Sequence, residues 1–335
     1  MRKWRMLVGM VVAMLAVGQL GAASASTLAV QVIAFTPPVL PEGLTVDRHG
    51  NIHVGILTTG EIRTVSADRT TTTTLGTVPV GKGLLTGLTT DRGGNVYAAL
   101  PSFDPATHGV WQVRPDGSAR RFAALPADGL PNSLHFDSRG DLYVSDSFLA
   151  TVWRITSNGV VQPWVQSSLL AGGVASQQPT GLSVGANGLA FDRNGDLYVN
   201  VTDFGRIVRV PARAGGVAGA PEIFVQSSEL VGADDLTFDE QGGLFVAVNR
   251  QNKIVWIGPN AMPVTVATQA DGLDFPASLA FGERGLDRGT LYVTNLAFLS
   301  LATGGTPRPS LMAIPLNVRG LSYWASESGT RQEGR

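Results

Sequence analysis

Four oxygen-bearing side chains occupy the same place in a repeated sequence pattern. Six short stretches each contain a leucine that begins an apolar run, and the residue two positions earlier reads Glu, Thr, Asn, Asn, Asp and Ala along the chain. We call the four members with carboxylate or amide oxygens the ligand column: Glu42, Asn132, Asn187 and Asp234. Because equivalent positions in a ring of repeats face one axis, these oxygens are expected to converge. Carboxylate and amide oxygens together are ligands that a hard cation prefers.

The chemistry of the ligand column selects among cations. The chain has no cysteine, and none of its four histidines lies in the column, so every available ligand is an oxygen. This set favours Ca²⁺, with Mg²⁺ and Mn²⁺ as alternatives. A single Asn or Asp at a strand start often only bonds nearby backbone. Four at equivalent positions favour a metal site, where a dication would offset the repulsion between Glu42 and Asp234. The neighbouring Asp235 is interpreted as a solvated or turn-bonding residue, and the alternative is an extra acid that tunes Asp234 or competes for its role.

The elements that must position the column form hairpins. After each leucine the chain alternates apolar and polar residues, makes a turn, and continues in a second strand. The turns that begin with Asp and end with Gly lie at 47–50, 91–94, 137–140, 192–195 and 239–242. Aspartate bonds its own backbone there, and glycine supplies the positive φ that a tight hairpin needs. The second strands recur every 44 to 55 residues, a period typical of β-propellers.

The count of repeats predicts an all-β, six-bladed β-propeller with four-stranded blades. The sixth repeat lacks an outer strand, and residues 28–35 read as an unassigned strand before the first repeat. We therefore expect this N-terminal strand to close the ring in the last blade, which would remove open sheet edges. Separate β domains or a solenoid are the alternatives, and the even spacing favours one ring.

The two ends of the chain are expected to lie outside the propeller. Residues 1–25 combine a basic start, an apolar run and the small-residue site Ala23-Ser24-Ala25, which predicts a secretory signal peptide, with an uncleaved anchor as the alternative. The propeller is expected over 26–320 and a polar tail over 321–335. The protein should then be exported to the periplasm or the cell exterior.

Composition narrows the expected partners. The formal net charge is −1 and no basic stripe is present, which argues against nucleic acid as a partner. No segment after the signal is long and apolar enough to cross a membrane. The expectation is a monomer that binds a small molecule.

The order of the ligand column resembles that of a known family. Six-bladed propellers of the senescence-marker-protein, gluconolactonase and luciferin-regenerating-enzyme type carry metal ligands in the order Glu, Asn, Asp, often with a further Asn. The related diisopropyl fluorophosphatase has Glu, Asn, Asn, Asp. The phrases Pro41-Glu42-Gly43 and Asn187-Gly188-Leu189 are similar to the family's local motifs. The resemblance covers nearly the whole mature chain. It implies hydrolysis at a Ca²⁺-type dication, with Asp234 as general base or nucleophile as well as ligand.

One departure bears on the substrate. Sugar-lactonase members of the family hold substrate with a basic residue before the asparagine of the third blade, where this chain has Gly129-Leu130-Pro131. A more apolar small ester or lactone is therefore expected. The alternative function is a non-catalytic, NHL-like binding or scaffold propeller with a structural metal or none. A strictosidine-synthase-like propeller without its catalytic set is a third interpretation.

Several other residues carry weaker signals. Loops 169–185 and 101–109 are expected at the column's end of the channel, as substrate lids or as tolerated surface insertions. His53 and His135 lie in expected strands and are interpreted as structural. Four polar residues that follow second strands are interpreted as turn formers, with support of the metal as the other option: Asp146, Asp203, Asn249 and Asn295.

Overall fold

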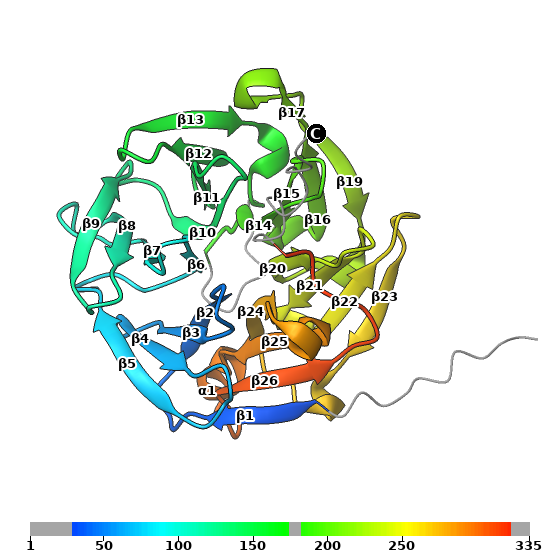
Figure 1. Ribbon diagram of the computed structural model, residues 1–335. Coiled ribbons are helices and arrows are strands. Elements are labelled where there is room, and N and C mark those ends of the chain that lie inside the picture. Colours follow the sequence, from blue (N-terminus) through cyan, green and yellow to red (C-terminus); the bar gives the residue numbers. More distant parts are fainter. Residues whose placement is uncertain (1–28, 174–181, 323–335) are drawn as a thin grey trace, which may run out of the picture.

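Six antiparallel sheets of four strands each surround one central axis in the computed structural model, which describes residues 29–173 and 182–322 (Figure 1). The predicted all-β, six-bladed propeller is confirmed. The expected signal peptide and most of the expected tail lie outside the described residues. The blades follow one another along the chain. In each blade one edge strand faces the axis and the strand at the other edge lies at the rim.

Each of the first three blades consists of four consecutive strands, of which the first lies nearest the axis and the last lies at the rim. Blade 1 contains β2 (Pro41–Val46), β3 (Ile52–Ile56), β4 (Glu61–Val65) and β5 (Thr72–Thr77). Blade 2 contains β6 (Leu88–Thr90), β7 (Val96–Leu100), β8 (Gly109–Val113) and β9 (Ala119–Ala124). Blade 3 contains β10 (Pro131–Phe136), β11 (Leu142–Asp146), β12 (Thr151–Ile155) and β13 (Val161–Gln166).

The last three blades include one insertion and one borrowed strand. Blade 4 contains β14 (Ala186–Phe191), β15 (Leu197–Val201), β16 (Arg206–Val210) and β19 (Glu222–Gln226), with the small hairpin β17 (Ala212–Arg213) and β18 (Val217–Ala218) inserted before β19. Blade 5 contains β20 (Ala233–Phe238), β21 (Leu244–Val248), β22 (Lys253–Ile257) and β23 (Pro263–Ala267). Blade 6 contains β24 (Pro276–Phe281), β25 (Thr290–Asn295), β26 (Ser310–Pro315) and β1 (Val30–Ala34).

The N-terminal strand closes the ring, as predicted. β1 lies antiparallel to β26, with Val30 opposite Ala313 and Ala34 opposite Ser310. Side-chain hydrogen bonds join blade 1 to blade 6: the Arg69 guanidinium of blade 1 donates to Asp287 Oδ2 at 2.7 Å and to the Tyr292 hydroxyl at 2.8 Å. The first and last blades are thus held together both by the chain, which runs from β1 in blade 6 into blade 1, and by side chains.

Helical structure is short. The one α-helix among the described residues, α1 (Phe298–Ala302), follows β25. Single 3₁₀ turns make up the remainder: η1 (Ser168–Leu170), η2 (Thr202–Phe204), η3 (Ala214–Gly216), η4 (Ser228–Leu230), η5 (Asn249–Gln251), η6 (Gln269–Asp271) and η7 (Gly285–Gly289). Across the described ranges, no helix has the length and apolar character needed to span a bilayer.

The core lies between neighbouring blades. Six apolar clusters fill the six interfaces, and every residue of the second strands β3, β7, β11, β15 and β21 is buried. Aromatic rings link successive blades edge to face: Tyr143 of β11 meets Phe191 of β14 with ring centroids 5.0 Å apart. Blade 1 has a buried histidine instead, and His53 Nδ1 lies 2.9 Å from Thr64 Oγ1.

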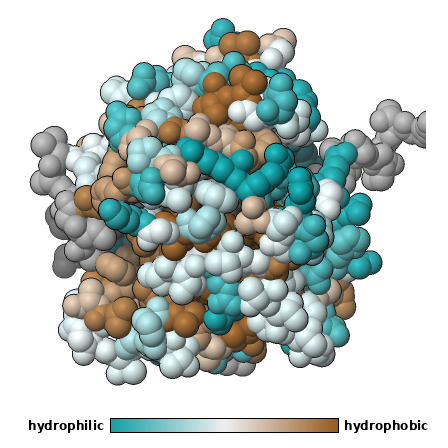
Figure 2. Space-filling model, turned by 90° about the vertical axis from the view of Figure 1, so that its left-hand side faces the viewer, coloured by the Kyte–Doolittle hydropathy of each residue, from teal (hydrophilic) through white to brown (hydrophobic). Residues whose placement is uncertain are grey.

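The rim is more polar than the interfaces. The outermost strands β5 and β9 consist mostly of exposed or half-buried residues, among them Thr72–Thr74 and Arg120. Figure 2 shows the side of the ring that carries these strands, where hydrophilic and pale surface surrounds small apolar patches. The inner strands, which carry the ligand column, are mostly buried, in contrast to this rim.

Candidate functional site

The structure brings the four members of the ligand column together. Glu42 lies on β2, Asn132 on β10, Asn187 on β14 and Asp234 on β20, each at the second position of an inner strand. All four line one cavity of about 10 Å³, together with Gly87, Ser133, Asp235, Ala277 and Ser278. This volume is close to the smallest that can hold one water molecule. The site therefore has room for one small ion among side chains from four blades.

A β-bulge in the inner strands decides which residues face the cavity. In β20, Ala233 lies opposite Val248 while Leu236 lies opposite Val246, so the register shifts between them. The same shift occurs in β2, β10, β14 and β24. A bulge lets two consecutive residues point to the same side, which simple alternation forbids. Asp234 and Asp235 consequently both line the cavity.

Glycines after the column allow the inner strands to approach closely. A Cβ on Gly188 would lie 2.5 Å from Asp235 Cα, and one on Gly43 would lie 2.3 Å from the Thr86 carbonyl oxygen. Both contacts are with backbone of the next blade, so they cannot be relieved by a rotamer change. Glycine at these positions thus sets the distance between the strands that carry the column.

Asp234 is held by two amides. Asn187 Nδ2 donates to its Oδ1 at 2.6 Å, and Asn249 Nδ2 donates to its Oδ2 at 2.9 Å. Burial raises the pKa of Asp234 to about 7. The hydrogen bond from Asn249 opposes this rise, the negative charge of Asp235 adds to it, and the hydrogen bond from Asn187 opposes it as well. The carboxyl group is therefore fixed in orientation and titrates near neutrality when no cation is bound.

Glu42 carries the clearest mark of a missing partner. Burial raises its pKa well above the usual range, and the charges of Asp234 and Asp235 raise it further. Its Oε2 atom is buried, and among the described residues no group donates a hydrogen bond to it. A carboxylate oxygen in this position is costly unless a cation or a proton satisfies it.

The buried Glu42 oxygen without a donor among the described residues indicates that this set of side chains fits a hard cation. Asn132 uses Nδ2 to bond Ser147 Oγ at 3.2 Å, and Asn187 also uses Nδ2 for its bonds, so both amide carbonyl oxygens can serve as ligands. Within residues 29–173 and 182–322, no three acidic or histidine side chains gather closely enough to hold a metal by themselves. The two amides would therefore be essential members of the site, with Glu42 and Asp234 supplying the charge.

Asp235 is committed to structure. It accepts from Ser278 Oγ at 2.7 Å and from the Leu279 amide at 3.2 Å, both in blade 6, and from the Leu236 amide at 2.9 Å. Burial raises its pKa to about 6, and these three bonds oppose the rise. Its interpretation as a solvated or turn-bonding residue is therefore corrected, because Asp235 lies within strand β20 and bonds the inner strand of the next blade.

Of the four presumed turn formers, one contacts the column. Asp146 accepts from the amides of the second and third residues after it, as a turn former does. Asp203 and Asn295 accept from amides 19 and 21 residues away, so they join separate loops and do not form turns of their own. Asn249 instead bonds Asp234, which matches the alternative interpretation that such a residue supports the site. Sequence reasoning missed two further supports, Ser147 and Thr202; aligning the repeats one residue past the second strand would have placed them beside Asn249.

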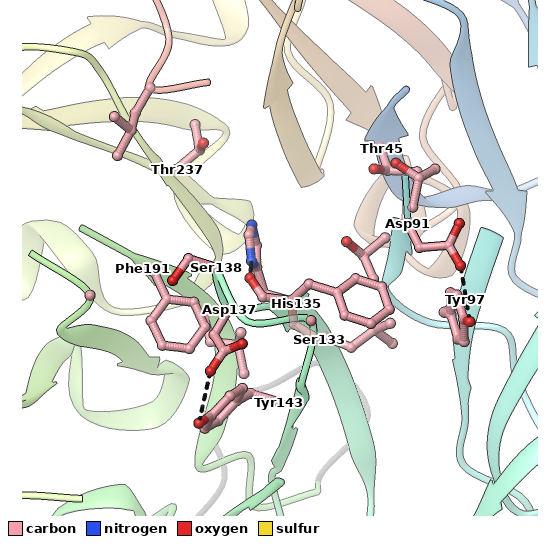
Figure 3. Close-up of a pocket in the computed structure, with 18 of the residues that line it drawn as sticks. Thr45, Asp91, Tyr97, Ser133, His135, Asp137, Ser138, Tyr143, Phe191 and Thr237 are labelled. Atoms are coloured by element: carbon pink, nitrogen blue, oxygen red, sulfur yellow. Dashed lines mark hydrogen bonds between the residues drawn. The ribbon is translucent and has the colours of Figure 1, made fainter. Parts of the chain in front are cut away.

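A much larger cavity opens at the opposite end of the channel, beside the hairpin turns (Figure 3). Its volume is about 1150 Å³, and it borders Ser133 and Asp235 but not Asp234. Thr45, Thr237 and His135 line its inner part. Burial lowers the pKa of His135 to about 4, so its imidazole is neutral near pH 7. The interpretation of His135 as a structural residue thus needs refinement, because its ring points into this cavity (Figure 3).

The two expected lids differ in what can be said of them. Loop 101–109 follows β7 at the column's end; its His108 is buried, with Nδ1 bonded to the Ser102 amide at 3.0 Å, while Phe103 is 93% exposed. Loop 169–185 begins with η1, whose Leu170 is buried, but residues 174–181 lie outside the described residues. The role of lid stays a prediction for both.

Comparison with known proteins agrees with the propeller fold. Residues 169–297 match the family described as SMP-30/Gluconolactonase/LRE-like region. No curated protein sequence matches the chain significantly. Among solved structures, the fold is similar to a calcium-binding regucalcin from Agrobacterium tumefaciens, with a TM-score of 0.67, 18% identity, and coverage of 86% of this chain and 93% of that one.

Two further solved structures share the fold and differ in activity. A gluconolactonase from Xanthomonas campestris has a TM-score of 0.64 and 16% identity, with 88% of this chain and 93% of that chain covered. Virginiamycin B lyase from Staphylococcus aureus has a TM-score of 0.56 and 15% identity, with 80% of each chain covered. At these identities the likeness concerns the fold alone. The chain resembles the SMP-30/gluconolactonase/LRE-like proteins in sequence over residues 169–297, and it shares their six-bladed propeller over most of its length.

Proposed function

We propose that this protein is an exported hydrolase of a small ester or lactone that depends on a divalent cation, with Ca²⁺ as the expected ion. One observation carries the proposal: four blades place Glu42, Asn132, Asn187 and Asp234 around one ion-sized cavity, where a buried Glu42 oxygen has no donor among the described residues. The calcium-binding regucalcin and the gluconolactonase among the fold's relatives support this class of chemistry. The signal-type pattern of residues 1–25 supports export.

Asp234 would act as general base. A bound dication would supply Lewis-acid polarisation of the scissile carbonyl and would acidify a water. Asn187 and Asn249 hold the Asp234 carboxylate in one orientation, so it can accept a proton from the attacking water without a rotamer change.

The lining of the small cavity bears on the substrate. In the described part of the chain, no lysine or arginine lines it, and Leu130 is the half-buried residue that precedes β10. A site without a fixed cationic side chain does not select for an acidic substrate. We therefore expect a neutral ester or lactone with an apolar portion.

The decisive experiment compares the two adjacent aspartates. Metal analysis of purified protein would be followed by assays with a panel of lactones and aryl esters, for wild type, Asp234→Asn and Asp235→Asn. We expect a bound dication, turnover by wild type, loss of activity by at least about a hundredfold in Asp234→Asn, and retention of most activity in Asp235→Asn. Circular dichroism would check that both variants are folded.

Each contrary result has a defined meaning. If Asp234→Asn keeps its activity, Asp234 is not the base; if only Asp235→Asn loses activity, the roles are reversed. If wild type binds no dication and turns over nothing, the protein is better described as a binding propeller without catalysis. Cell fractionation tests export separately, and retention of the protein in the cytoplasm would contradict it.

A further inference from the structure

A second set of polar side chains lies directly behind the ligand column. Five blades share a position one residue past the second strand, defined by an amide that bonds the carbonyl just before the inner strand of the same blade. The residues at this position are Leu57, Ser147, Thr202, Asn249 and Leu296. It is polar in blades 3, 4 and 5, which carry three column members, and apolar in blades 1 and 6.

Each polar member bonds the column residue of its own blade. Asn132 Nδ2 donates to Ser147 Oγ at 3.2 Å, and Asn187 Nδ2 donates to Thr202 Oγ1 at 3.1 Å. In blade 5 the direction of the bond is reversed, since the column residue is an acceptor, and Asn249 Nδ2 donates to Asp234. The residue type thus changes with the column side chain: a hydroxyl accepts from an amide, and an amide donates to a carboxylate.

The two hydroxyls also reach the next blade. Ser147 Oγ donates to the Ala186 carbonyl at 2.6 Å, and Thr202 Oγ1 donates to the Ala233 carbonyl at 2.8 Å. Those carbonyls immediately precede the column residues of blades 4 and 5. Because the hydroxyl proton is engaged there, its lone pair must face the column amide. This arrangement turns the Asn132 and Asn187 side chains so that Nδ2 points outward and the carbonyl oxygen points away from the hydroxyl.

We infer that Ser147, Thr202 and Asn249 form a supporting ring that positions the oxygens of Asn132, Asn187 and Asp234 for cation binding. The inference rests on the proposed cation site. The three residues bond the column side chains and do not themselves line the cavity, so they are positioning residues. Groups of this kind, which orient the ligands of a metal, commonly change metal affinity by about 10- to 100-fold when removed.

The chain offers matched controls for the two hydroxyls. Ser145 Oγ donates to the Asn187 carbonyl at 2.5 Å and accepts from the Ser133 backbone amide at 3.0 Å. Thr294 Oγ1 donates to the Glu42 carbonyl at 2.7 Å and accepts from the Ser278 backbone amide at 3.0 Å. Both therefore link neighbouring blades as the supporting ring does, but neither bonds a side chain of the column.

The experiment measures Ca²⁺ affinity of chelator-stripped full-length protein by titration calorimetry. The pairs are Ser147→Ala against Ser145→Ala, and Thr202→Val against Thr294→Val; Asn249→Leu introduces the residue found at this position in blades 1 and 6. We expect Ca²⁺ to bind at least tenfold more weakly to the ring variants and within about threefold of wild type to the controls. Thr202→Ser keeps the hydroxyl and should restore affinity.

A second measurement does not depend on a cation. In protein labelled with ¹⁵N-asparagine, the side-chain amide resonances of Asn132 and Asn187 should move in Ser147→Ala and Thr202→Val, and stay in the controls. If wild type binds Ca²⁺ and the ring and control variants lose affinity equally, the ring only links blades and the inference is wrong. If wild type binds no Ca²⁺, the cation part of the proposed function fails, and unmoved amide resonances would then overturn the positioning role as well.

Discussion

Replacing Gly188 by alanine tests whether close approach of inner strands shapes the site. A Cβ at this position would lie 2.5 Å from Asp235 Cα and 2.7 Å from the Asp234 carbonyl oxygen, whereas ordinary contact begins at 3.4 Å. Blades 4 and 5 would have to separate locally by about 0.9 Å to accommodate the methyl group. The same movement would stretch the Asn187–Asp234 bond from 2.6 Å to beyond hydrogen-bonding distance.

The expected cost follows from these two effects. Overpacking against backbone costs about 1–3 kcal/mol, and loss of a hydrogen bond to a charged group costs about 1.5–3 kcal/mol. We therefore expect Gly188→Ala to lower the free energy of unfolding by roughly 3–5 kcal/mol, measured by urea denaturation with tryptophan fluorescence. The melting temperature should fall by on the order of 10 °C.

Gly305→Ala is the matched control. Gly305 is exposed, its φ is not in the left-handed region, and the nearest atom to an added Cβ is 3.3 Å away. This variant should stay within about 0.5 kcal/mol of wild type. If Gly188→Ala is as stable as Gly305→Ala, the inner strands can separate freely, and the argument that glycine sets the spacing of the ligand column is refuted.

Two further predictions concern ring closure and pH. Arg69→Met should lower the free energy of unfolding by about 1–3 kcal/mol, because it removes the bonds to Asp287 and Tyr292 that join the first and last blades; a urea midpoint equal to that of wild type would contradict this. After a chelator has removed bound metal, the free energy of unfolding should fall as pH rises from about 4 to 7. Folding raises the pKa of Asp234 from 3.8 to about 7, so in this range the folded state holds a proton that the unfolded state has released. Thermal melts of wild type and Asp234→Asn across this range check it; an equal slope in both would show that Asp234 is not the cause.

The fold was predictable because its determinants are local. Hairpin turns, alternation and burial are encoded in contiguous residues, and their even repetition left one closed ring as the simplest arrangement. The closing strand was recognisable from an unassigned N-terminal segment and an incomplete last repeat, and β1 occupies that place. The residue types and order of the ligand column were likewise visible in the repeat, before any coordinates.

The hydrogen bonds of the site were not predictable in the same way. A one-residue bulge in β20 makes Asp234 and Asp235 neighbours in one cavity, and strict alternation would have placed them on opposite faces. Only the tertiary structure pairs Asn249 and Asn187 with Asp234, because residues far apart in the chain meet there through the register of strands and the packing of two blades. The large cavity at the hairpin end likewise depends on the tertiary structure, because residues from all six blades line it. The sequence by itself determined which oxygens could meet at the axis, whereas the packing of neighbouring blades decided how each is held.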